Sequence, residues 1–196
     1  MNNSKRFTTK QLVGMAALTA IVIILQFVGS SIRFGVFSIS LVLIPIVVGA
    51  ALFGAAGGAW LGFVFGVVVL LSGDAGPFLA VNPAGTVVTV LLKGIAAGLA
   101  AGLVYRALQD KNRYLAVIVA ACVCPIVNTG IFLICCKLFF MDTISAWAEG
   151  AGFKSAGAYM ILGLAGVNFL LEMAVNIVLS PVIMRLIAIG QKENER

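Results

Sequence analysis

Long apolar runs separated by short polar segments dominate the pattern of this chain. A helix that crosses a bilayer needs about 20 mostly apolar residues. The runs predict six membrane-spanning helices, over residues 11–28, 38–53, 57–71, 86–105, 114–140 and 157–189. The second and third runs are short and are joined by residues 54–57, so they form either a tight hairpin or one bent element.

The segment 72–86, SGDAGPFLAVNPAGT, interrupts this pattern with glycine and proline between the third and fourth spans. Irregular backbone near membrane depth survives only when it is buried in protein or lines a wet cavity. The segment also brings together a carboxylate, an aromatic ring and an amide, in Asp74, Phe78 and Asn82. It therefore predicts a binding region in an outer loop.

Composition supports a membrane protein, because 62% of the residues are hydrophobic and only 10% are charged. A water-soluble domain of this size cannot hide so much apolar surface. We expect an all-α, polytopic six-helix bundle that forms a single transmembrane domain over residues 1–196. The Lys and Arg residues cluster beside the apolar runs rather than forming a binding face, so a nucleic-acid partner is not expected.

The basic residues also predict the orientation, because Lys and Arg concentrate in short cytoplasmic loops. With both termini in the cytoplasm, nine basic residues fall on that side: Lys5, Arg6, Lys10, Arg106, Lys111, Arg113, Arg185, Lys192 and Arg196. The opposite orientation reverses this bias. The segment 72–86 is then expected to face outward.

Two ionisable residues lie within predicted spans, Lys93 and Glu172. Charges at membrane depth are costly and are candidates for function, usually with a partner. One interpretation is a structural Lys93–Glu172 pair, with Asn128, Asn168 and Asn176 as hydrogen-bond links between helices. The other makes Lys93 the counter-charge of an anionic ligand and the asparagines its polar contacts.

Small residues recur at intervals of four in two helices, at Gly54, Gly58, Gly62 and Gly66 and at Gly94, Gly98 and Gly102. Such ridges let helices approach closely, and we expect them to hold the third and fourth spans inside the bundle. Ala16 and Ala20 make a similar pair near the cytoplasmic end of the first span. That pair suits either ordinary packing or a partner helix.

The chain carries little sign of catalysis. It has no His, and its four cysteines all lie in one apolar stretch, so we expect buried thiols, no metal site, no cofactor and no enzyme activity. A phosphate-binding G-x-x-x-x-G-K-[ST] motif is missing, so the chain is not expected to hydrolyse ATP. The outward loop 141–156 carries Trp147 and Phe153, which are either interfacial anchors or aromatic lid residues.

These features together resemble the substrate-binding S components of energy-coupling factor (ECF) vitamin transporters. The resemblance rests on the size, the six spans, the sequence AALTA at 16–20, the block at 37–86 and the sequence VLLKG at 90–94. It implies a protein of the bacterial cell membrane that captures a vitamin and docks onto a transmembrane coupling protein with two ATPase subunits. In this family the alanine motif contacts the coupling protein, which assigns Ala16 and Ala20 to that interface.

The central block is most similar to the pantothenate branch of the family. Riboflavin and the pyrimidine precursor of thiamine are the alternative substrates, and a stand-alone channel or facilitator is the alternative of a different class. In the pantothenate interpretation two aromatic residues cover the ligand, two polar loop residues fix the loop or bind the ligand, a lysine neutralises the carboxylate and two asparagines bind the polar tail. These residues are Phe78, Trp147, Asp74, Asn82, Lys93, Asn128 and Asn168.

Overall fold

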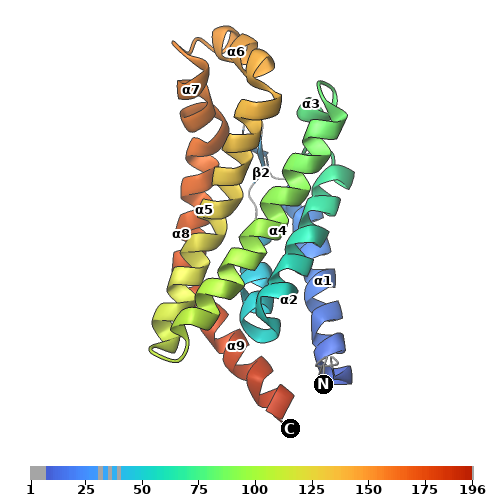
Figure 1. Ribbon diagram of the computed structural model, residues 1–196, viewed down its shortest axis with the longest axis vertical. Helices are drawn as coiled ribbons and strands as arrows, with labels where there is room; N and C mark the ends of the chain where they lie inside the picture. Colours follow the sequence, from blue (N-terminus) through green and yellow to red (C-terminus); the bar gives the residue numbers. More distant parts are fainter. Residues whose placement is uncertain (1–7, 31–32, 35–36, 39–40, 196) are drawn as a thin grey trace, which may run out of the picture.

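The computed structural model of the protein describes residues 8–30, 33–34, 37–38 and 41–195. Long helices lie side by side in it, and the start of α1 lies at the same end of the bundle as the end of α9 (Figure 1). The elements are α1 (Thr9–Ser30), β1 (Arg33–Phe34), β2 (Phe37–Ser38), α2 (Leu43–Leu71), α3 (Gly76–Leu79), α4 (Pro83–Leu108), α5 (Arg113–Phe139), α6 (Met141–Gly150), α7 (Ala156–Ala158), the π-helix η1 (Tyr159–Gly166), α8 (Val167–Val178) and α9 (Ser180–Glu195).

The prediction of a helical membrane protein is confirmed. Apart from β1 and β2, which pair antiparallel over two residues each, the regular elements of the described residues are helices. Five of these helical segments are long and apolar enough to cross a membrane, namely α1, α2, α4, α5 and Ala156–Val178. The predicted count of six is therefore not confirmed.

The difference in count arises at Gly54, where the predicted second and third spans join into α2. Gly54 has φ 76° and ψ −175°, a conformation that favours glycine and breaks the helix. Its two limbs fold back on each other, since a methyl group added to Gly58 would lie 2.7 Å from the Cβ of Ala50. The first limb has only 11 residues up to Phe53, about 16 Å of helix. That is too short to cross the hydrocarbon core of about 30 Å.

The predicted sixth span, residues 157–189, consists of several pieces. Ser155 caps its start by accepting a hydrogen bond from the backbone N–H of Ala158 at 3.2 Å. The chain then continues through α7, η1 and α8, and a break at Leu179 precedes α9. Pro181 suits the first turn of a new helix, because its missing N–H has no partner there. The apolar span ends at Val178 as a result.

Glycines bring α2 and α4 into close contact, as the spacing predicts. A methyl group on Gly62 would overlap the backbone carbonyl of Gly94, and one on Gly58 would overlap that of Gly98. The two helices thus meet backbone to backbone. This confirms that the glycine ridges hold the third and fourth predicted spans together.

The four cysteines are free thiols, and three of them, Cys124, Cys135 and Cys136, are buried. The expectation of buried thiols is confirmed for these three, whereas Cys122 is half-buried. Cys124 belongs to the main hydrophobic core, which is built largely from α2, α4, α5 and α9. Cys136 belongs to a smaller cluster that joins α5 to α3, α6 and η1.

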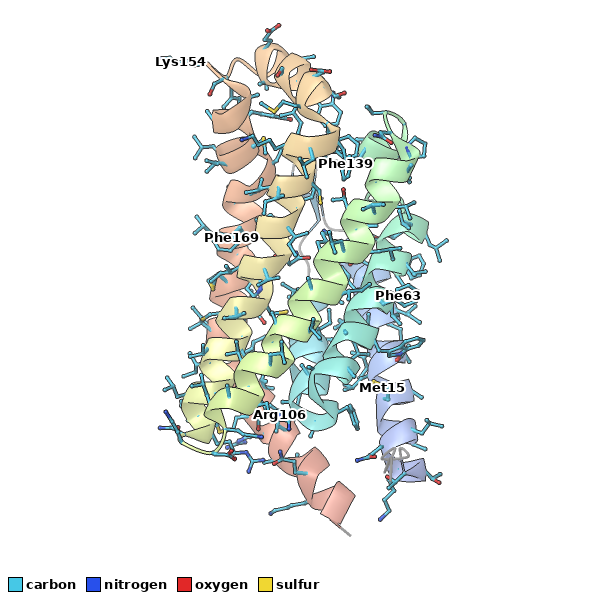
Figure 2. All side chains as sticks on the ribbon, viewed as in Figure 1. Met15, Phe63, Arg106, Phe139, Lys154 and Phe169 are labelled. Carbon is cyan, nitrogen blue, oxygen red and sulfur yellow. The ribbon has the colours of Figure 1, made fainter. Side chains whose placement is uncertain are left out.

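The bundle has two distinct ends. Arg106 lies toward the end that holds the two described termini, and Lys154 lies at the opposite end beside α6 (Figure 2). Both loop helices, α3 and α6, are at that opposite end (Figure 1). The basic residues Lys5, Arg6 and Arg196 of the predicted cytoplasmic side lie outside the described residues. The assignment of the terminal end to the cytoplasm stays a prediction.

Candidate functional site

The interrupted segment between α2 and α4 is ordered by local hydrogen bonds. After α2 the chain turns at Gly73, which has a positive φ of 82°, and then forms the four-residue helix α3. Asn82 caps α4, because its Oδ1 accepts a hydrogen bond from the backbone N–H of Gly85 at 2.9 Å. Pro83 follows at the first position of α4. The segment therefore fixes the orientation in which Asp74 and Phe78 face the bundle.

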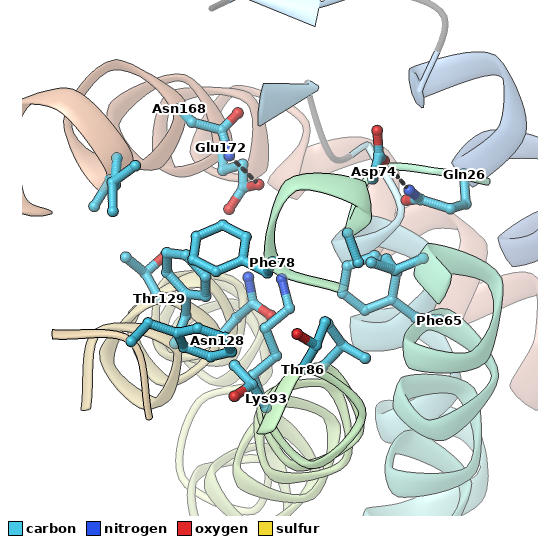
Figure 3. Close-up of a pocket in the computed structure, with 18 residues that line it drawn as sticks. Gln26, Phe65, Asp74, Phe78, Thr86, Lys93, Asn128, Thr129, Asn168 and Glu172 are labelled. Carbon is cyan, nitrogen blue, oxygen red and sulfur yellow. Dashed lines mark hydrogen bonds between the residues drawn. The ribbon is translucent and has the colours of Figure 1, made fainter. Parts of the chain in front are cut away.

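A cavity of about 70 Å³ lies inside the bundle beneath this segment. A space of this size has room for several water molecules or for part of an organic ligand. Its wall combines aromatic and aliphatic side chains with amides, hydroxyls and three ionisable groups (Figure 3). The lining residues are Gln26, Phe65, Val69, Asp74, Ala75, Phe78, Thr86, Thr89, Val90, Lys93, Asn128, Thr129, Phe132, Phe140, Leu164, Ala165, Asn168 and Glu172.

Lys93 of α4 points its ammonium group between aromatic rings of this wall. Its Nζ lies 5.4 Å from the centroid of Phe65 and 5.5 Å from that of Phe132. Cation–π contacts of this kind attract an ammonium group without neutralising its charge. Among the described residues, no side chain forms a direct ion pair or hydrogen bond with Lys93, although the carboxyl groups of Glu172 and Asp74 line the same cavity and act electrostatically on its ammonium group.

Each of the two carboxylates in the wall is held by an amide. Gln26 Nε2 on α1 donates to Asp74 Oδ2 at 2.5 Å, and Asn168 Nδ2 donates to Glu172 Oε1 at 3.0 Å within α8. Figure 3 shows both bonds at the cavity. Glu172 is 2% exposed, so its carboxyl group is buried. These bonds fix the direction of both carboxylates at the cavity wall.

Asn128 of α5 presents an unused hydrogen-bond acceptor at the cavity. The residue is 4% exposed, and its Oδ1 is buried without a hydrogen-bond partner among the described residues. A buried amide oxygen without a partner costs about 1–3 kcal/mol. A ligand that donates a hydrogen bond at this point would remove that cost.

Aromatic side chains close the cavity at the end of the bundle that holds α3 and α6. Phe78 of α3 lines the cavity and meets three rings edge to face, those of Phe132, Phe140 and Trp147, with centroid distances of 5.7, 5.1 and 5.3 Å. Trp147 of α6 lies behind Phe78 and is not part of the lining. The predicted loop 141–156 is thus largely helical, and it packs on α3.

The structure brings most of the predicted site residues together. The cavity lining includes Asp74, Phe78, Lys93, Asn128 and Asn168. Asn82 is outside the lining and caps α4 instead, and Trp147 reaches the cavity only through Phe78. Whether any of these residues binds a ligand stays a prediction.

Several residues of the cavity lining were not predicted as site residues from the sequence. Thr86, Thr89 and Lys93 lie at intervals of three and four on α4, which places them on one face of that helix. Gln26 is an isolated amide near the end of an apolar span, and a rare polar residue at depth is a usable signal. Glu172 drew notice only as a possible partner of Lys93. The aromatic residues Phe65 and Phe132 carry no sequence signal that separates them from ordinary core residues.

Ala16 and Ala20, the predicted partner interface, both lie exposed on α1. One helical turn separates them, so they share a face. Trp60 of α2 lies nearby in the fold, since its Nε1 donates to Thr19 Oγ1 at 3.2 Å. The face is open in the described structure, and its role as an interface stays a prediction.

The fold and the cavity define a helical membrane protein with a partly polar cavity inside its bundle. Residues 10–184 match the family described as ECF transporter, substrate-specific component, and the chain belongs to that family. The family is a class of transporter subunits that bind the substrate and work with an ECF module, and it is not an enzyme family. The match confirms the resemblance at the level of the family.

A solved structure of ThiT from Listeria monocytogenes has a similar fold, with a TM-score of 0.65. The two sequences are 21% identical, and the similarity covers 93% of this chain and 95% of ThiT. At this identity the comparison establishes the fold alone. No curated protein matches the sequence at a significant level. Neither comparison identifies the pantothenate branch.

Proposed function

We propose that this chain captures a water-soluble vitamin for import by an ECF transporter, and that the vitamin is pantothenate. Pantothenate is a small organic acid that combines one carboxylate with hydroxyl and amide groups. The cavity offers one cation, several hydroxyls and amides, and aromatic walls that exclude water. A few placed polar groups in an otherwise apolar wall are typical of small-molecule sites.

The position of Lys93 carries this proposal. Its ammonium group faces the cavity and lies against the rings of Phe65 and Phe132, with no direct ion pair to the acidic side chains of the same wall. A buried cation is costly without a counter-charge. A ligand carboxylate supplies that charge and forms a strong, charge-assisted hydrogen bond.

The polar tail of the ligand is expected along α4, α5 and α8. The Oδ1 of Asn128 accepts a hydroxyl or amide hydrogen, and Thr86, Thr89 and Asn168 lie in the same wall. The hydroxyls of Thr86 and Thr89 donate to backbone carbonyls of their own helix, at 2.8 and 2.6 Å. Their oxygens therefore remain available as acceptors.

The chain is proposed to deliver the vitamin through a transmembrane coupling protein and two ATPase subunits, with Ala16 and Ala20 on the coupling interface. Small residues on an exposed helix face let a partner helix approach closely. In this arrangement both termini lie in the cytoplasm of a bacterial cell, and α3 and α6 cover the cavity on the outer side.

Equilibrium binding to a small vitamin panel tests the proposal. Trp147 packs on Phe78, which lines the cavity, so its fluorescence reports on changes at the cavity wall, and a Trp60→Phe background removes the other tryptophan. Lys93→Ala is expected to weaken pantothenate binding about 30-fold or more, because removing one member of a buried charge pair costs about 2–5 kcal/mol. Lys137→Ala is the matched control, because Lys137 is exposed in the last turn of α5.

Two results contradict parts of the proposal. Tight binding of riboflavin or of the thiamine-precursor pyrimidine, without pantothenate binding, overturns the vitamin and leaves the capture function intact. Vitamin uptake by cells that express this chain without a coupling module indicates a facilitator that acts alone.

A further inference from the structure

A second hollow lies on the outside of the bundle, between α5 and the η1–α8 segment. It has a volume of about 420 Å³, and Thr129 provides its one side-chain hydroxyl in an otherwise apolar lining. Side chains at its rim are exposed and aliphatic, including Ile126 at 49%, Leu162 at 65% and Leu170 at 65%. Both walls belong to membrane-spanning segments, so the hollow opens toward lipid.

The hollow is a local dent rather than a stripe along which a helix can pack. On each wall a glycine stands between larger residues one turn away, Gly130 on α5 and Gly166 at the end of η1. A methyl group on Gly130 would meet nothing within 4 Å, so the floor is open there. Helix pairing in membranes favours small residues at several successive turns. A flexible hydrocarbon chain fits a dent of this shape better than a helix does.

The hollow and the cavity described above share part of one wall. Thr129 and Ala165 line both the cavity and the hollow. At these positions a single residue of each helix separates the two spaces. Asn128 precedes Thr129 in the chain, and Asn168 follows Ala165 by about one turn. The wall also includes the π-helical stretch η1, and wide turns of this kind occur often at functional sites.

We propose that an acyl chain of a bilayer lipid lies in this hollow and supports the shared wall, so that ligand affinity depends on the shape of the lipid chain. The depth agrees with this occupant, since Gly130 lies about 14 Å from the α6 end of α5 and so falls at the level of the hydrocarbon core. The occupied hollow fixes Thr129 and Ala165, and through them the positions of Asn128 and Asn168. The link to affinity rests on the proposed function, whereas the lipid site does not.

Photocrosslinking tests the lipid site directly. The full chain is reconstituted in phosphatidylcholine vesicles that contain a lipid with a diazirine in the middle of its acyl chain, and labelled peptides are mapped by mass spectrometry. We expect labelling concentrated on the α5 and η1–α8 walls. Gly130→Leu, which fills the floor, should reduce it to the level of other exposed helices. Val88→Leu on α4, at an exposed position outside the hollow, should leave it unchanged.

Leu162→Ala provides a second variant that does not disturb the core, since Leu162 is mostly exposed and forms one wall. It should also reduce labelling of the hollow. Even labelling of all exposed helices, unchanged in Gly130→Leu and Leu162→Ala, would overturn the lipid site.

The coupling is tested by measuring pantothenate affinity in vesicles of straight-chain and of methyl-branched phosphatidylcholine. We expect the wild-type affinity to fall about fivefold in branched lipid, the lower end of typical coupling between sites. Gly130→Leu should bind equally in both lipids, and Val88→Leu should behave like the wild type. Equal wild-type affinity in the two lipids would overturn the coupling. Concentrated labelling without any vitamin binding supports the lipid site and contradicts the proposed function alone.

Discussion

The rings of Phe78 and Trp147 meet edge to face, with 5.3 Å between their centroids and 78° between their planes. Phe78 belongs to the interrupted segment after α2, and Trp147 belongs to α6, which follows α5. Phe78 is 5% exposed and lines the cavity, whereas Trp147 does not reach it. The contact therefore joins α3, which covers the cavity directly, to α6, which packs on its outer side. The two loop segments therefore close the cavity together.

This contact predicts that Trp147→Ala speeds ligand release without removing the site. An edge-to-face pair contributes about 0.5–1.5 kcal/mol beyond simple burial, so release should become roughly three- to tenfold faster. Stopped-flow measurement of the dissociation rate checks the change. In a double-mutant cycle with Phe78→Leu, the two effects should not add. Additive effects, or an unchanged rate, would show that the contact does not hold the cover.

Lys93→Met separates a structural lysine from a ligand-binding one. Lys93 forms no direct ion pair with a described residue and lies between two aromatic rings inside the bundle, so replacing its charge by an apolar side chain of similar length should leave the ligand-free protein as stable or more stable. Ligand affinity should be lost at the same time. Thermal unfolding in detergent with and without vitamin provides both measurements. A marked loss of stability without ligand would favour the structural interpretation instead.

Gly62→Ala is expected to destabilise the bundle, because its methyl group would overlap the carbonyl of Gly94 where α2 and α4 touch. Overpacking of this kind costs about 1–3 kcal/mol. Gly130→Ala is the matched control, since its methyl group would meet open space. The control should be neutral or slightly stabilising, as alanine is the better helix former. Equal unfolding temperatures for the two variants would contradict the close contact.

Gln26→Leu tests the tie between α1 and the interrupted segment. Gln26 Nε2 donates to Asp74 Oδ2, and hydrogen bonds to charged groups contribute about 1.5–3 kcal/mol. Losing this bond should free the segment before α3 and weaken ligand binding about tenfold or more. Hydrogen exchange over residues 72–82 checks the local effect. Gln11→Leu, near the opposite end of α1, serves as the control and should leave exchange over that segment unchanged.

Phe78 and Gly62 show how much of this protein could be predicted from the sequence. The glycine spacing on α2 and α4 predicted their contact, because backbones approach only where side chains are missing from a whole helix face. Phe78 was predicted at the ligand site, because it lies in an irregular segment that lipid does not tolerate uncovered. The family follows from sequence alone as well, since residues 10–184 match it.

Other features depended on contacts between distant residues. The predicted count of six spans was not confirmed at α2, because a periodic apolar pattern does not reveal that Gly54 folds the chain back after a limb of about 16 Å. Gln26 and Glu172 were not assigned to the site, because their partners and their exposure to the cavity are set by packing between helices. Asn82 has the residue type of a binding group, yet the backbone of α4 uses it as a cap.

The sequence by itself determined that the chain is a helical membrane protein of a transporter family, because hydrophobic length and local spacing are properties of the chain alone. It also determined that Lys93 places a costly charge at membrane depth, where a charged residue usually has a partner or a function. Only the tertiary structure decided which side chains surround that charge. Packing of α4 against α2 and α5 places the ammonium group between Phe65 and Phe132 at a cavity, away from any ion pair with Glu172. The surroundings of Lys93 depend on distances between residues of different helices, and the spacing of residues along the chain does not give those distances.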